Sequence, residues 1–193
     1  LLKALSEAPP GAPWYGFARM DRRLTDRDFC AALKRAGCVM LKLGLESGDQ
    51  EVLDRMQKGI DLETASRALR TLKKAGIATY VYLLFGTPAE TLRSARKTLE
   101  FTAGHSEEIG FLNLAMFNMP VNGPEKGEIE TRLFYEGDLS LYTDFVHPRG
   151  WDRKQVRRFL EEEFKKNKAV STILKKDPPL FTSNHAPFFV MEQ

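Results

Sequence analysis

The sequence has no run of about 18 apolar residues free of charge, so we expect no transmembrane helix. It does not open with a basic segment followed by an apolar run, so we expect no secretory signal either. Basic and acidic side chains nearly balance, at 29 and 26, and leave a net charge of +3. A charge this small over 193 residues does not indicate a nucleic-acid or membrane partner. We therefore expect a cytoplasmic protein.

Cysteine is scarce, with only Cys30 and Cys38. The two thiols lack a Cys-x-x-Cys spacing, and they lie where a helix and a strand would bury them. The three histidines are scattered, without the spacing that metal ligands share. The sequence thus predicts neither a disulfide framework nor a metal site in this chain. Its composition, 42% hydrophobic and 28% charged, is typical of a globular domain.

Apolar strands alternate with amphipathic helices along the first part of the chain. The strands are predicted at 14–19, 39–46, 78–85 and 111–119. The helices are predicted over 25–36 with Thr25 as N-cap, near 50–57, after Asp61, and from Thr87-Pro88-Ala89-Glu90, a capping box. Strands alternating with helices of this length predict an α/β fold with right-handed βα units and a parallel sheet.

The predicted strands differ between their two faces. Side chains alternate along a strand, so Leu41, Leu43 and Leu45 share one apolar face, which we expect to pack on helices. The opposite face gathers polar and aromatic groups, namely Arg19, Lys42, Glu46, Tyr80, Tyr82 and Asn113. An unpaired buried carboxylate is costly, so this face must be paired, wet or occupied by a ligand. A barrel-like arc accounts for it better than a flat sheet, and parallel barrels collect function at the carboxyl ends of their strands.

The alternation stops after Gly127, which predicts a barrel part over 1–127 and a C-terminal extension over 128–193. In the extension, a helix starting near Asp152 would bury Val156, Phe159, Leu160 and Phe164 on one stripe. A short helix is predicted at 170–176, and the prolines at 178, 179 and 187 predict an extended tail. Irregular, aromatic sequence of this kind suggests a segment that wraps one barrel end or its open edge.

Three blocks, in this order and spacing, carry a resemblance to a known family. They are ARMDRRLTDRDFCAALKRAGC (18–38), LKLGLESGDQEVLDRMQKG (41–59) and LRTLKKAGIATYVYLLFGTPAET (69–91), with weaker agreement through NLAMFNMPVNGP. The chain resembles the radical S-adenosylmethionine (SAM) superfamily over about residues 14 to 105. It is most similar in pattern to cobalamin-dependent and methylthiotransferase-type members. The resemblance implies part of a (βα)6 partial TIM-like barrel, with these segments as its third to sixth strands.

The resemblance also implies which residues would face SAM. Glu46 and Ser47 would contact its polar methionyl or ribose groups, and Lys58 corresponds to a basic position that holds polar groups of the ligand. Leu84 would face the adenine, and Gly86 would let the backbone approach the ligand closely. The remaining candidates are Arg19 at a strand end, Tyr82 at a position more often small or acidic, and Met119 and Pro120 in the stretch beside the adenine.

Structural roles remain open for the same residues. Glu46 could form an ion pair with Lys42 or Arg19 inside the arc, and Arg19 could serve only in such a pair. Ser47 could be the N-cap of the next helix. Lys58 could favour a helix dipole, and Gly86 could be a helix-entry glycine.

The sequence departs from the family pattern in one major respect. Family catalysis uses a [4Fe–4S] cluster held by a Cys-x-x-x-Cys-x-x-Cys loop, which this sequence lacks. We therefore expect the C-terminal part of a radical SAM enzyme that is inactive by itself. In the parent, the cluster would cleave SAM reductively to start radical chemistry on an unknown small-molecule or macromolecular substrate, with cobalamin as an optional cofactor.

Two alternatives remain. A barrel that lost its cluster could act as a binding or scaffold module. Another parallel-barrel enzyme could use a phosphate-bearing substrate, although no Gly-rich phosphate loop precedes a helix. If the first barrel strands are absent, the strand at 14–19 is an unpaired edge, and we expect the chain to self-associate through it.

Overall fold

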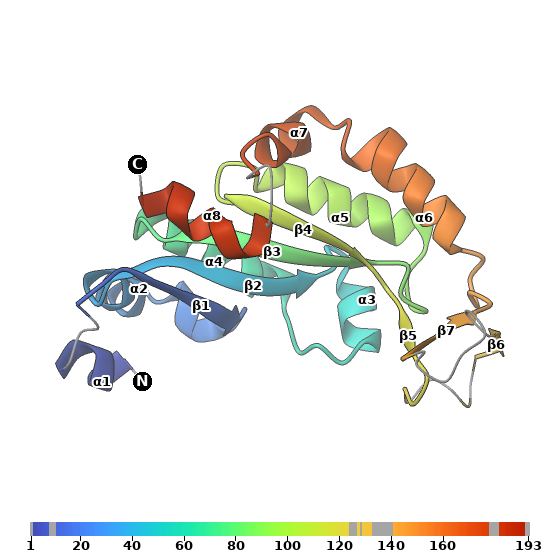
Figure 1. Ribbon diagram of the computed structural model, residues 1–193, viewed down its shortest axis with the longest axis horizontal. Coiled ribbons are helices and arrows are strands. Elements are labelled where there is room, and N and C mark those ends of the chain that lie inside the picture. The colour runs from blue at the N-terminus through green and yellow to red at the C-terminus, as the bar shows by residue number, and fades with distance from the viewer. Residues whose placement is uncertain are drawn as a thin grey trace.

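The computed structural model describes residues 2–7, 11–123, 127, 129–132, 141–177 and 182–191. Its centre is a four-stranded parallel sheet in the order β1-β2-β3-β4 (Figure 1). The strands are β1 (Trp14–Arg19), β2 (Cys38–Glu46), β3 (Ala78–Phe85) and β4 (Phe111–Met116). A sequential parallel order with helical crossovers confirms the predicted α/β fold.

Helices connect and cover the strands. The first part of the chain contains α1 (Leu2–Glu7), a 3-10 turn η1 (Arg22–Thr25), α2 (Arg27–Arg35), α3 (Gln50–Arg55), α4 (Leu62–Lys74) and α5 (Leu92–Gly104). The later part contains the short strands β5 (Met119–Pro120), β6 (Thr131–Arg132) and β7 (Tyr142–Phe145). It continues through α6 (Arg153–Phe159), a π turn η3 (Leu160–Phe164), α7 (Lys168–Leu174) and α8 (Thr182–Met191). Among the described residues, none of these helices is long and apolar enough to cross a bilayer.

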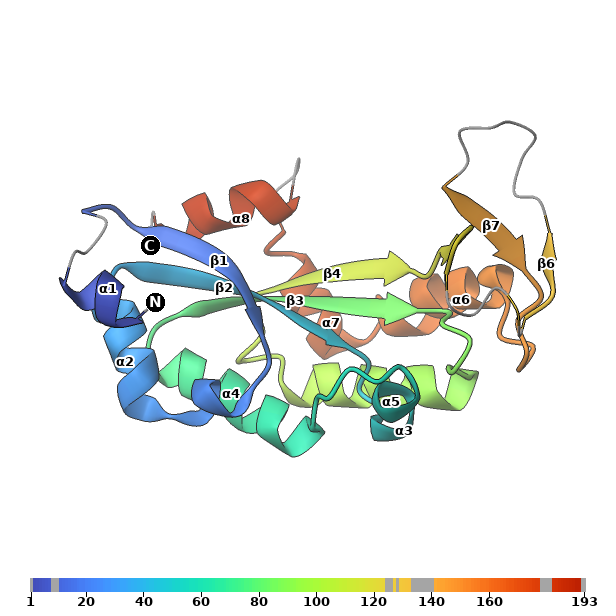
Figure 2. The ribbon, with the colours of Figure 1, turned by 90° about the horizontal axis from the view of Figure 1, so that it is seen from below.

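The main core lies between the sheet and the helices α2, α4 and α5, which Figure 2 shows on one face of the sheet. Leu41, Leu43 and Leu45 are buried there, as their shared face predicted. Their partners include Leu69 and Leu72 of α4. Burial of a leucine side chain contributes about 1.5–3 kcal/mol, so this layer fixes which face of each strand points outward.

The opposite face of the sheet is covered in part by α8, on the side where Figure 2 shows no other long helix. Met40, Tyr80, Phe111 and Ala186 form a second small core there. The prediction of an extended tail is therefore wrong over residues 182–191, where the helix contains Pro187. Burial of Ala186 against the sheet stabilises the helix in spite of that proline. Pro178 and Pro179 lie outside the described residues.

Two predicted helix starts are wrong by a few residues. After β1, Asp26 rather than Thr25 is the N-cap, because its carboxylate accepts from the N–H groups of Asp28 and Phe29. After β3, the helix begins at Leu92 with Thr91 as its N-cap. Residues 87–90 form a turn instead of a capping box, since the Glu90 carboxyl is bound elsewhere.

The chain after β4 combines a small antiparallel sheet with helices. The strands β5, β7 and β6 pair in that order. The helix predicted near Asp152 is confirmed, with Asp152 and Gln155 forming a capping box. Its apolar stripe is buried in the same core as β2 and β3, through Val156, Phe159, Leu160 and Phe164. The 127/128 domain boundary stays a prediction.

Candidate functional site

Three charged residues predicted from the sequence lie together at the carboxyl ends of β1 and β2. Lys58 Nζ lies 3.5 Å from Glu46 Oε1, and the Arg19 guanidinium donates a hydrogen bond to the Lys58 carbonyl oxygen. The Lys58 and Glu46 side chains are 37% and 22% exposed, so the group remains open to solvent. We call Arg19, Glu46 and Lys58 the charged cluster.

The ion pair that the sequence offered between Glu46 and Lys42 does not form. Lys42 is almost fully buried, and its Nζ lies 4.7 Å from the centre of the Tyr15 ring and 5.2 Å from that of Phe17. Burial lowers the pKa of Lys42 below its usual range. The aromatic rings of two β1 residues therefore stabilise the Lys42 cation. Glu46 forms its ion pair with Lys58 instead.

The backbone of β2 changes direction where it carries Glu46. Glu46 has φ 68°, in the left-handed region that non-glycine residues rarely adopt. The pairing of β2 with β3 shifts register between Gly44 and Glu46, which is the signature of a bulge. A Cβ at Gly44 would lie 2.9 Å from Glu46 Oε1, so the carboxylate folds back across the space that glycine leaves. Such strain persists only where the surroundings hold the backbone in place.

The loop that follows Glu46 is fastened to α5. Thr98 Oγ1 accepts the Gly48 N–H at 2.9 Å and lies 3.2 Å from Ser47 Oγ. Lys97 Nζ lies 3.0 Å from Asp49 Oδ1. A Cβ at Gly48 would lie 2.7 Å from Thr98 Cα, so only glycine permits this approach. The loop is thereby held by three contacts over consecutive residues.

Ser47 is therefore not in the charged cluster. It is fully buried, and its hydroxyl is turned toward α5. The alternative role as the N-cap of α3 belongs instead to Asp49, whose carboxylate accepts the Glu51 N–H. Ser47 supports that cap by accepting the Asp49 N–H at 3.1 Å.

The candidates on β3 line the same sheet face as the charged cluster. Tyr82 pairs with Gly44 across the β2–β3 ladder, and its ring lies 6.0 Å from that of Phe17. Leu84, two residues later, is half-buried beside Ala115 of β4. An apolar and aromatic row thus runs next to the charges, which is an arrangement suited to a zwitterionic ligand with a flat ring.

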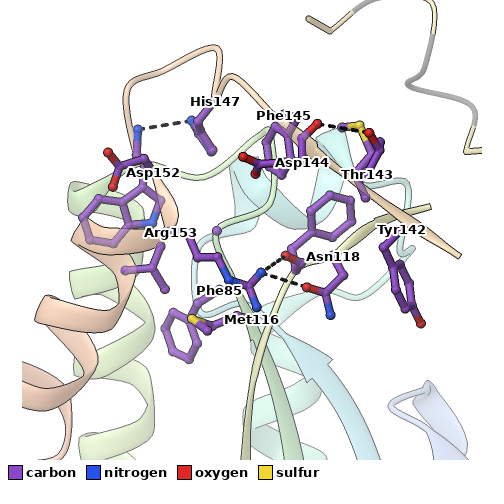
Figure 3. A pocket seen from close by; sticks show the side chains of 15 residues that line it. Phe85, Met116, Asn118, Tyr142, Thr143, Asp144, Phe145, His147, Asp152 and Arg153 are labelled. Atoms are coloured by element: carbon purple, nitrogen blue, oxygen red, sulfur yellow. Dashed lines mark hydrogen bonds between the residues drawn. The ribbon is translucent and has the colours of Figure 1, made fainter. Parts of the chain in front are cut away.

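Gly86 and Met119 meet at a second place, a small pocket between the end of β3 and the C-terminal segment (Figure 3). Gly86 has φ 78°, and Met119 is fully buried, while Pro120 is exposed on β5. Arg153 reaches toward this pocket from α6 and donates to Asn118 Oδ1 at 2.8 Å. The pocket holds about 30 Å³, enough for one or two water molecules.

Sequence reasoning missed a buried carboxyl group beside this pocket. Glu90 is fully buried, and its Oε2 accepts the Gly86 N–H at 2.5 Å and the Trp151 indole N–H at 2.9 Å. Burial raises the pKa of Glu90 to about 7. The local spacing had suggested a capping role for this residue, and no local signal connects it with Trp151, which lies 61 residues away.

His147 holds the adjoining turn. Its Nδ1 accepts the N–H groups of Arg149 and Trp151, so Nε2 carries the proton and donates to the Thr87 carbonyl at 2.8 Å. Burial lowers the pKa of His147 below its usual value, which keeps the ring neutral. The turn after β3 is thus bound to the C-terminal segment through two side chains, Glu90 and His147.

The two cysteines do not fit an iron–sulfur cluster. Both are buried, and burial raises the pKa of Cys30 to about 11 and that of Cys38 to about 12. Cluster ligands are thiolates, and both thiols are enclosed in the main hydrophobic core, which disfavours that charged form. Cys38 also opens β2, at the opposite end of the strand from Glu46. Within the described part of the chain, no three His, Cys, Asp or Glu side chains gather to hold a metal.

Comparison with known proteins finds similarity to one family. The family model described as the radical SAM superfamily matches residues 18–102. The cobalamin-dependent radical SAM methyltransferase TokK of Streptomyces tokunonensis is 33% identical over 90 residues, which are 45% of this chain and 13% of TokK. The anaerobic magnesium-protoporphyrin IX monomethyl ester cyclase of Rubrivivax gelatinosus is 27% identical over 107 residues, 55% of this chain and 19% of the cyclase.

A solved structure has the same fold. The radical SAM methyltransferase TsrM from Kitasatospora setae, with cobalamin and a [4Fe–4S] cluster bound, aligns with a TM-score of 0.51 and 19% identity. The alignment covers 60% of this chain and 24% of TsrM. At that identity the likeness concerns the fold alone. The chain spans less than a fifth of either sequence relative and about a quarter of TsrM.

Proposed function

Because residues 18–102 belong to the radical SAM superfamily, we propose that this chain carries the SAM-facing strand ends of a radical SAM enzyme. One observation carries the proposal. Arg19, Glu46 and Lys58 come from three separate parts of the sequence and meet at the carboxyl ends of parallel strands. Function collects at those ends in parallel barrels.

The charged cluster matches the polar end of SAM in its chemistry. Glu46 would accept hydrogen bonds from an ammonium group, and Lys58 would donate to a carboxylate. Tyr82 and Leu84 would offer an apolar surface to the adenine, and the backbone near Gly86 and Met119 would lie beside it. Ser47 would act on this site through the position of its loop, because its hydroxyl is bound to α5.

In a longer parent protein, a bound [4Fe–4S] cluster would supply the electron that cleaves SAM. Since Cys30 and Cys38 do not fit that cluster, we propose that its ligands belong to a longer parent protein and that this chain alone is inactive. Cobalamin is a proposed further cofactor of the parent, because TokK is cobalamin-dependent and the structure of TsrM contains cobalamin. We also propose a cytoplasmic location for the parent.

Calorimetric titration with S-adenosylhomocysteine, an unreactive relative of SAM, tests the binding site. Glu46→Gln and Lys58→Gln should each weaken binding by about tenfold or more, since a charge-assisted hydrogen bond contributes about 1.5–3 kcal/mol. Glu51→Gln is the matched control, because Glu51 forms an exposed ion pair with Arg55 on α3, outside the charged cluster.

Two results would contradict the proposal. Failure of the folded wild-type chain to bind the probe would remove the SAM site itself. If all three variants bound the probe as tightly as the wild type, the ligand would not lie at the charged cluster. If the chain is instead a cluster-less binding module, the same affinities are expected. In that case the parent protein would bind no iron–sulfur cluster and would not cleave SAM after treatment with iron and sulfide.

A further inference from the structure

A buried carboxyl group joins the end of β3 to the segment that precedes α6. Glu90 Oε2 accepts the Gly86 N–H at 2.5 Å and the Trp151 indole N–H at 2.9 Å. Trp151 is itself buried and belongs to the main core. We call Gly86, Glu90 and Trp151 the β3 latch.

Burial of a carboxyl group at this position lowers the stability of the fold when the group is ionised. Glu90 is fully buried, and Oε1 has no hydrogen-bond partner among the described residues. Within that part of the chain, the charge that acts on Glu90 is the like charge of Asp49 and not a cation, so its negative charge would be poorly compensated. A glutamine of the same shape could accept the same two N–H groups without that cost. The structure therefore retains a group that gains or loses a proton near neutral pH, since its pKa is about 7.

The other titratable groups around the β3 latch have partners of their own. Asp49 raises the pKa of Glu90 by charge repulsion, but it is paired with Lys97 at 3.0 Å. His147 is held neutral between the Thr87 carbonyl and two backbone N–H groups. Asp152 caps α6 by accepting the Gln155 N–H at 2.8 Å. Glu90 is thus the group of this set whose charge is left to vary at neutral pH.

The β3 latch reaches the candidate site through Gly86. This residue comes two positions after Leu84, on the strand end that faces the proposed ligand. It also lines the small pocket together with Met119, His147 and Trp151 (Figure 3). A Cβ at Gly86 would lie 3.2 Å from Val156 Cγ2, so α6 packs directly against this backbone. Any shift of Trp151 or α6 would be transmitted to the end of β3.

We propose that Glu90 is a positioning residue that couples the end of β3 to the C-terminal segment, so that gain or loss of its proton shifts Gly86 and Trp151 together. The effect on SAM rests on the proposed function, in which the backbone at Gly86 lies beside the ligand. The only chemical step is exchange of one proton between the Glu90 carboxyl group and solvent. A proton-linked contact of this kind would make ligand affinity depend on pH through a residue that never touches the ligand.

Nuclear magnetic resonance spectra recorded between about pH 5 and pH 9 test the coupling. We expect the Gly86 amide and the Trp151 indole N–H to shift with one shared midpoint near neutrality. Glu90→Gln keeps an acceptor oxygen and should abolish both titrations, whereas Glu100→Gln, an exposed change on α5, should leave them. The Trp14 indole, which donates to the Ala36 carbonyl at 2.6 Å, is the internal control and should not titrate with this midpoint.

A second variant tests the contact even if Glu90→Gln does not fold. Trp151→Phe removes the indole donor that favours the ionised carboxyl, so the midpoint of the Gly86 amide should move to higher pH. The matched change Trp14→Phe should leave it in place. An unmoved Gly86 midpoint in Trp151→Phe, or separate midpoints for Gly86 and Trp151 in the wild type, would overturn the proposal.

The affinity for S-adenosylhomocysteine separates this proposal from the proposed function. In the wild type, we expect a severalfold change in affinity with the same midpoint, and a constant affinity in Glu90→Gln. An affinity that does not follow the shared midpoint would overturn the link to the ligand. If the probe does not bind at any pH, the proposed function fails, while the midpoints of Gly86 and Trp151 still decide whether Glu90 positions both.

Discussion

The hydroxyl of Thr98 offers a sharp test of how the loop after Glu46 is held. Thr98→Val keeps the shape of a fully buried side chain and removes its oxygen. The buried Gly48 N–H then loses its acceptor at 2.9 Å, and Ser47 loses one of its two partners. A buried donor without a partner costs about 1–3 kcal/mol, and a second hydrogen bond adds about 1 kcal/mol. We therefore expect the free energy of unfolding to fall by about 2–4 kcal/mol.

Thr102→Val is the matched control for this change. Thr102 is also fully buried in α5, but its hydroxyl bonds only to the Thr98 carbonyl, one turn earlier in the same helix. Its loss should cost less than about 1 kcal/mol, because no donor elsewhere loses its partner. Urea unfolding of both variants measures the two free energies.

The same pair of variants tests whether the loop controls the site. Thr98→Val removes two of the three contacts between this loop and α5 and leaves the Lys97–Asp49 pair. The loop would then hold Glu46 at φ 68° less firmly, so Thr98→Val should also weaken binding of S-adenosylhomocysteine. Equal stability loss in the two valine variants would refute the assignment of the Gly48 and Ser47 contacts to Thr98. A loss confined to stability, with affinity unchanged, would refute the control of Glu46 by this loop.

Two further predictions concern pH and association. The pKa of Glu90 is raised to about 7 in the folded chain, so its contribution to stability is present at low pH and is lost as the pH rises through 7. Relative to Glu90→Gln, the wild type should therefore lose up to about 3 kcal/mol of unfolding free energy between about pH 5 and pH 8, and an unchanged difference in urea unfolding would disprove this linkage. Among the described strands, β1 pairs only with β2, and Phe17 is 76% exposed at that edge, so the chain should self-associate and Phe17→Lys should reduce the association. Light scattering that finds a monomer at high concentration in both proteins would count against an associating edge.

Much of the fold follows from patterns within short stretches of sequence. The third strand is observed at Ala78–Phe85 as predicted, and the helix near Asp152 begins at its capping box. Alternation along β2 correctly placed Leu41, Leu43 and Leu45 on the buried face. These features depend on neighbours within a few residues, so the periodicity of strands and helices and the chemistry of caps are enough to predict them.

The candidate site depends on contacts between residues that are far apart in the sequence. The sequence placed Arg19 and Glu46 at strand ends, and the family resemblance added Lys58, but the partner of Glu46 stayed open between alternatives. The structure pairs Glu46 with Lys58, at the place where β2 carries a bulge. The same holds for α8, which forms where the sheet offers an apolar patch despite its proline.

Glu90 shows most clearly what tertiary structure adds. Its local sequence fits a helix cap, but a tryptophan 61 residues later supplies a hydrogen bond that draws its carboxyl group away from the helix. Ser47 and Thr98 are likewise 51 residues apart. Sequence alone determined the four strands of the parallel sheet, the presence of the helices that connect them and the side chains that carry charge. Packing of distant segments determined which of those charges are paired, buried or free to change, because desolvation depends on every neighbour at once.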